Sequence, residues 1–127
     1  MQWEHIMNNK DECSRFSLRA AAGARLAETT VAAATKASLA GMRSSARGRQ
    51  PIASARQMAM YLAHVAFGLS LTRVGLCFGR DRTTVRHACA RMEDRRDDFR
   101  LECGLNALEA ALLTSMAGLE RCAGEVR

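Results

Sequence analysis

Arginines dominate one short stretch of the sequence, FGRDRTTVRHACARMEDRR, which runs from Phe78 to Arg96 and sets six arginines against three acidic residues. An exposed helix stays soluble at lower electrostatic cost when unlike charges stand three or four residues apart. An unbalanced set of guanidinium groups suits a polyanion instead, because the planar fork of arginine matches phosphates and guanine edges. These residue types therefore predict nucleic-acid recognition.

The positive charge of the whole chain is concentrated in the segment that contains this stretch. Of the 127 residues, 19 are basic and 13 acidic, which leaves a net charge of +6. Residues 43–96 carry eleven arginines and three acids, whereas residues 97–127 carry three arginines and six acids. A basic patch confined to one segment is the expected footprint of a nucleic-acid interface.

The arginine-rich stretch has the pattern of a helix with one buried and one basic face. Asp81 is a candidate N-cap, and Val85, Cys89 and Met92 repeat at the spacing of a buried stripe. The opposite face carries Arg82, Thr83, Arg86 and His87. This face is predicted to enter the major groove, where Asp81 can either cap the helix or accept from a cytosine amino group.

A second short helix is predicted directly before it. Ser70 is a candidate N-cap for LTRVGLCF, in which Leu71, Val74 and Phe78 repeat at helical spacing. Gly79 and Arg80 leave only a tight connection to Asp81. Two short helices joined in this way, the second with a basic outer face, predict a helix-turn-helix.

The flanking segments are also predicted to be helical, which makes the chain all-α. Met58, Leu62 and Val65 mark an apolar face in a helix that Gly68 closes, and residues 17–40 form an alanine-rich helix. Residues 41–51, GMRSSARGRQP, read as a basic linker or arm. We expect an N-terminal helical arm with its linker at 1–50, a helix-turn-helix domain at 51–98 and a C-terminal helix at 99–127. The apolar seam of that last helix either packs on the domain or pairs with another chain; it comprises Leu105, Leu108, Leu112, Met116 and Leu119.

Several other classes of protein do not fit the sequence. The five cysteines are odd in number, have no paired short spacing and follow no secretory segment, so we expect a reduced, cytoplasmic and nucleoid-associated protein. No apolar run is long enough to span a membrane. Phosphate loops, HExxH and nucleophile elbows are absent, so we expect no enzyme activity and no metal, nucleotide or other cofactor. Tyr61 is predicted to pack and His64 to lie on the surface or near a phosphate.

The segment from residue 51 to residue 96 resembles the C-terminal DNA-binding domain of the bacterial replication initiator DnaA. The resemblance rests on ARQMAMYLA, GLSLTRVGLCFGRD and DRTTVRHAC at their separations in this sequence. It implies a recognition helix in the major groove of duplex DNA. Asp81, Arg82 and Thr83 would then read bases, with Thr84 and His87 beside phosphates.

The resemblance also implies contacts from residues ahead of the recognition helix. Arg56 would reach a base and Gln57 the DNA backbone. A basic segment before the domain would enter the minor groove through Arg49 or Arg47.

Two departures from the family pattern affect function. The family has FGGRDHTTV where this chain has FGRDRTTV, so one glycine is missing and Arg82 replaces a histidine. Because arginine favours guanine, the preferred DNA sequence should differ from that of the initiator. The chain also lacks a GxxxxGK[ST] loop, so it does not carry the family's ATPase module.

Two functions remain open at this level. The first is a sequence-specific double-stranded DNA-binding protein that regulates transcription or modulates replication initiation at DnaA-box-like sites. The second is an interaction module that binds an acidic partner or the initiator. A homodimer formed through the terminal helices is compatible with both.

Overall fold

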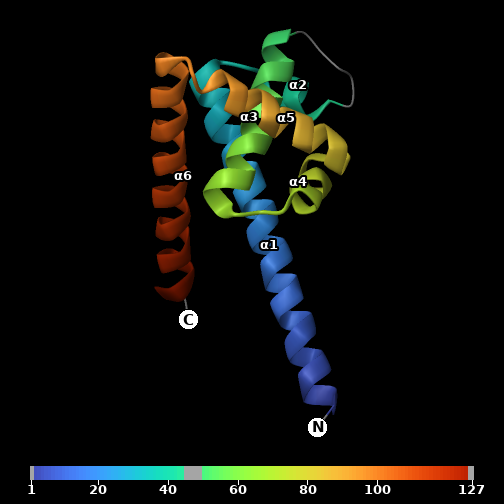
Figure 1. Ribbon diagram of the computed structural model, residues 1–127. Coiled ribbons are helices and arrows are strands. Elements are labelled where there is room, and N and C mark those ends of the chain that lie inside the picture. Colours follow the sequence, from blue (N-terminus) through green and yellow to red (C-terminus); the bar gives the residue numbers. More distant parts are fainter. Residues whose placement is uncertain (1, 45–49, 126–127) are drawn as a thin grey trace.

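The computed structural model describes residues 2–44 and 50–125, with side chains from residue 18 onward except those of residues 123 and 125. The described part of the chain consists of helices and contains no strand, which confirms the all-α prediction (Figure 1). The helices are α1 (Gln2–Thr35), α2 (Leu39–Arg43), α3 (Gln50–Phe67), α4 (Leu71–Phe78), α5 (Arg82–Arg95) and α6 (Phe99–Glu125).

The C-terminal half of α1 belongs to the core. Ala20, Ala24, Ala27 and Val31 recur at helical spacing and are at most 2 % exposed. Because alanine side chains are small, α1 can lie close against α3, with which it packs extensively. The alanine-rich segment predicted as an arm is therefore one wall of the domain, while Figure 1 shows the N-terminal half of α1 extending away from the other helices.

Helix α3 is the central helix and contacts α1, α2, α4, α5 and α6. Its predicted apolar face is only part of what it buries, because neighbours surround it on several sides. Leu62 is fully buried as expected, but so are Met60 and Tyr61, whereas Met58 and Val65 are only partly buried. Gly68, with a φ of 66°, follows the end of α3 as predicted.

The predicted linker is shorter than residues 41–51. Residues 41–43 belong to α2, which begins after Ser38, whose hydroxyl accepts a hydrogen bond from the Gly41 amide at 3.2 Å. Residues 50 and 51 belong to the first turn of α3, where the missing N–H of Pro51 breaks no helical hydrogen bond. The alanine-rich helix likewise ends at Thr35, before Lys36 with its φ of 60°.

Helix α6 packs on its own domain along the first part of its leucine seam. Leu105 and Leu112 are fully buried, and α6 lies against both α3 and α1. Leu119, further along, is 55 % exposed. The structure therefore places the first part of the seam within the chain's own core. No helix in the described ranges is long and apolar enough to cross a membrane.

The start of α6 is held by Arg96, at the C-terminal end of α5. Its guanidinium lies 3.4 Å from a Glu102 carboxylate oxygen and 3.9 Å from one of Glu109, both on α6. The same guanidinium lies 5.4 Å from the centre of the Tyr61 ring. This cation–π and ionic cluster joins α3, α5 and α6.

Candidate nucleic-acid interface

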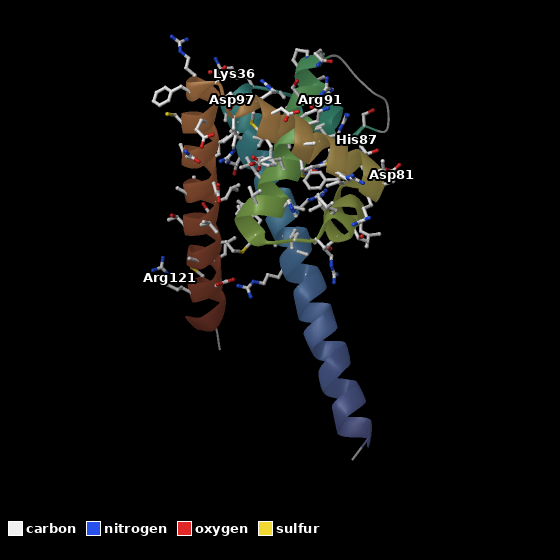
Figure 2. The ribbon with its side chains drawn as sticks, in the orientation of Figure 1. Lys36, Asp81, His87, Arg91, Asp97 and Arg121 are labelled. Carbon is white, nitrogen blue, oxygen red and sulfur yellow. The ribbon has the colours of Figure 1, made fainter. Side chains whose placement is uncertain are left out.

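The basic face of α5 is open to solvent. Val85, Ala88 and Met92 are at most 2 % exposed and turn α5 toward the core, mainly against α3 and α4. The opposite face is exposed and carries Arg82, Thr83, Arg86, His87 and Arg91. In Figure 2, Asp81, His87 and Arg91 follow one another along α5. Within the described part of the chain, these five residues of α5 are left uncovered.

Asp81 is the N-cap of α5, as predicted. Its backbone is extended, and its carboxylate Oδ1 accepts a hydrogen bond from the Thr84 amide at 2.7 Å. Hydrogen bonds from Thr84 hold the pKa of the Asp81 carboxyl below its usual value, so the group stays ionised. Asp81 and Thr84 therefore fix the start of the recognition helix while both remain exposed.

The turn between α4 and α5 is built on two glycines. Gly79 takes a left-handed conformation with a φ of 65°, and the Arg80 amide donates to the Gly75 carbonyl at 2.9 Å. A Cβ atom on Gly75 would lie only 2.6 Å from the Arg80 carbonyl oxygen. Gly75 thus permits the close approach of the turn to α4. Its only signal in the sequence is a glycine inside LTRVGLCF, and the sequence analysis missed its importance.

Arg56 does not lie among the exposed arginines, and this revises the expectation that it reaches a base. It is 8 % exposed, and its guanidinium donates to the carbonyls of Met42 at 2.7 Å and Gly41 at 3.0 Å. Burial, followed by the charge of Arg80, lowers the pKa of Arg56. A base contact would require this side chain to leave its carbonyl partners.

The other residues predicted ahead of the recognition helix have mixed outcomes. Gln57 lies on α3 and is half-buried, so part of its side chain is accessible. Arg47 and Arg49 lie outside the described residues. Their assignment to the minor groove therefore stays a prediction.

A buried acid that the sequence analysis overlooked braces the same region. Glu28 on α1 is 2 % exposed, and its carboxylate lies 2.8 Å from Arg43 Nε and 3.3 Å from Arg25 Nη2. Arg25 also donates to the Cys77 carbonyl and lies 5.6 Å from the centre of the Phe78 ring. The signal was an acid four residues after Ala24 on the buried face of α1, where an unpaired carboxylate would be costly.

The aromatic residues of α3 serve the fold. Tyr61 is 1 % exposed, which confirms that it packs, and its hydroxyl donates to Glu93 at 2.5 Å. His64 is half-buried with Nδ1 2.5 Å from the Leu69 carbonyl oxygen, so it braces the α3–α4 connection and does not lie on an open surface. Among the described residues, no cluster of three or more His, Cys, Asp or Glu side chains could hold a metal ion.

Comparison with known protein families identifies the arrangement. Residues 27–92 match the family model described as the bacterial DnaA protein helix-turn-helix. The chain belongs to this DnaA helix-turn-helix family. The DnaA match begins within α1, so it includes residues 27–35 of α1 and all of α2, ahead of the boundary expected at residue 51. Membership in the DnaA family makes this, in general terms, a DNA-binding domain.

Proposed function

We propose that the protein is a sequence-specific double-stranded DNA-binding protein whose helix α5 lies in the major groove. The main support is the exposed basic face of α5, which lies opposite the buried stripe of Val85, Ala88 and Met92. Major-groove readout needs a helix that presents donors on one face while its other face is held by a rigid domain. Family membership supports this reading.

Each exposed group has a proposed partner on the duplex. Arg82, Thr83 and Arg86 contact base edges, where an arginine fork pairs best with guanine. Asp81 orients the helix start and can accept from cytosine. Backbone positioning falls to Gln57, Thr84 and His87, and minor-groove contact to Arg47 and Arg49.

The biological role that we propose is control of transcription, or modulation of replication initiation through binding at DnaA-box-like sites. DNA binding of this kind requires no catalytic step and no bound cofactor. Because Arg82 stands where the family has histidine, the preferred site should differ from the initiator's box at the base pair that Arg82 contacts, with guanine favoured there.

Selection of binding sites from a random pool of duplexes tests the proposal. Fluorescence anisotropy with a selected duplex and a scrambled duplex, at one fixed salt concentration, should show affinities that differ by about a thousandfold or more. The affinity for both duplexes should fall with added salt. Equal affinities for the two duplexes would refute sequence-specific binding, and no retarded species in gel shifts would refute DNA binding altogether.

Assembly through the terminal helices is a second candidate function, by which the domain could pair with another copy, an acidic protein or the initiator. The supporting observation is exposed leucine on these helices: Leu18 is 73 %, Leu113 47 % and Leu119 55 % exposed. Light scattering should give a dimer mass that Leu113→Ser combined with Leu119→Ser lowers to that of a monomer. A monomer mass for the unaltered chain at high concentration would contradict homodimerisation.

A further inference from the structure

Two arginines from the helix-turn-helix half of the domain hold the end of α2. Helix α2 has five residues, and beyond its C-cap bond, in which the Ser44 amide donates to the Gly41 carbonyl at 3.2 Å, its last carbonyl groups need partners from outside the helix. Arg56, on α3, donates to the carbonyls of Met42 at 2.7 Å, Gly41 at 3.0 Å and Ser44 at 3.5 Å. Arg80, in the turn between α4 and α5, also donates to the Ser44 carbonyl.

This arrangement depends on the shape of the arginine side chain. A guanidinium presents five N–H donors in one plane and can serve several carbonyls at once, whereas a lysine ammonium is a single compact charge. Arg56 and Arg80 are close enough for the charge of Arg80 to contribute to the lowered pKa of Arg56. Holding two like charges together is costly, so the carbonyl contacts must offset a repulsion.

A further ion pair anchors the end of α2 to α1. Arg43, its last residue, pairs with the buried Glu28 carboxylate of α1 at 2.8 Å. Ser44, which follows, is therefore tied to α1 through its neighbour Arg43 and to the helix-turn-helix half through Arg56 and Arg80. The next five residues of the sequence, 45–49, include Arg47 and Arg49.

Arg80 also stands at the start of the recognition helix. Arg80 directly precedes Asp81, the N-cap of α5. One side chain thus links the backbone position from which the basic segment departs to the backbone position at which α5 begins.

We propose that Arg56 and Arg80 are positioning residues for DNA recognition: by holding the backbone of residues 41–44, they set the start of the basic segment in register with the recognition helix. The inference rests on the proposed function, in which that segment contacts the minor groove while α5 occupies the major groove. Arg56 and Arg80 act through the segment and need not touch a base themselves.

A double-mutant cycle tests the proposal on the full chain with a selected duplex. The variants are Arg80→Ala, the segment variant in which Arg47 and Arg49 both become Ala, and the combination of all three changes. We expect Arg80→Ala to weaken binding about tenfold in the unaltered chain but only about twofold in the segment variant, because positioning has no value once the segment's arginines are gone. The loss of one cationic charge accounts for the remaining twofold.

Arg91→Ala is the matched control, since it removes an exposed arginine from the same basic face of α5. Its effect on affinity should be the same with and without the segment arginines. An equally large effect of Arg80→Ala in both backgrounds would overturn the positioning role while leaving the proposed function intact. If the segment variant binds as tightly as the unaltered chain, the minor-groove contact itself fails, and the positioning role fails with it.

Arg56→Lys provides a second variant that keeps the charge and removes the planar fork. We expect it to weaken binding about fivefold and to make binding less sensitive to distamycin, which occupies the minor groove. Thermal melts followed by circular dichroism would show that each variant is folded at the assay temperature. An Arg56→Lys protein that is folded and keeps full affinity and full sensitivity to distamycin would contradict the proposal.

Discussion

Replacing Gly75 by alanine, and comparing the result with the same change at a control glycine, should show how much the close packing of the helix-turn-helix turn contributes to stability apart from helix propensity. The new Cβ would lie 2.6 Å from the Arg80 carbonyl oxygen, and the other nearest atoms are also backbone atoms of Arg80 and Asp81. Because no flexible side chain can move aside, the turn itself must shift. Gly104 on α6 is the matched control, since a Cβ there would meet nothing within 4 Å.

The magnitude follows from two opposing effects. Alanine stabilises a helix interior by about 1 kcal/mol relative to glycine, and this applies to both positions. Overpacking against fixed atoms costs about 1 to 3 kcal/mol and applies to Gly75 alone. We therefore expect Gly104→Ala to raise the free energy of unfolding by about 1 kcal/mol. The free energy of unfolding of Gly75→Ala should be lower than that of Gly104→Ala by about 1 to 3 kcal/mol.

Urea unfolding followed by circular dichroism measures both free energies, and equal slopes would show that the two variants expose similar surface on unfolding. Since the shifted carbonyl belongs to the residue before Asp81, Gly75→Ala should also weaken binding to a selected duplex by about tenfold, or about 1.4 kcal/mol. Gly104→Ala should bind normally. The reasoning is refuted if both variants gain the same stability and bind DNA equally well.

Three further changes test the site and the core. Arg82→Ala should reduce the binding free energy for a selected duplex by about 1 to 3 kcal/mol and relax the preference at one base pair. Arg91→Ala should weaken binding to all duplexes alike and reduce its salt dependence. Titrations with single-base variants of the duplex would show both effects. Tyr61→Phe should lower the free energy of unfolding in urea by about 1 kcal/mol, because the buried hydroxyl loses its bond to Glu93. The lowered pKa of Asp81 means that its cap stabilises the fold above the usual carboxyl pKa and is lost as pH falls through the folded value. The melting temperature of the unaltered protein should thus fall more steeply below about pH 4 than that of Asp81→Asn.

Much of the helix-turn-helix could be predicted because its signals are local. An N-cap depends on a side chain and on amides two or three residues later, so Ser70 and Asp81 were identifiable from their neighbours, and the structure confirms both. The buried stripe through Val85 and Met92 follows from helical periodicity alone. The exposure of Thr83 on the opposite face follows with it.

What the sequence analysis could not see are contacts between distant segments. An arginine at residue 56 has the same local sequence whether it faces solvent or the end of another helix. Its burial depends on where α2 ends, because the carbonyl of Met42 lies within 2.7 Å only in the folded chain. Glu28 is likewise paired by Arg43, fifteen residues away.

The sequence by itself determined the two helices of the helix-turn-helix, their caps Ser70 and Asp81, and the concentration of arginine in residues 43–96, since these depend on composition and on short spacings. Tertiary structure alone decided which arginines remain on the surface and which are used inside, and that half of α6 covers the core. The physical reason is that burying a charged or apolar side chain requires partners, and those partners come from helices far apart in the chain.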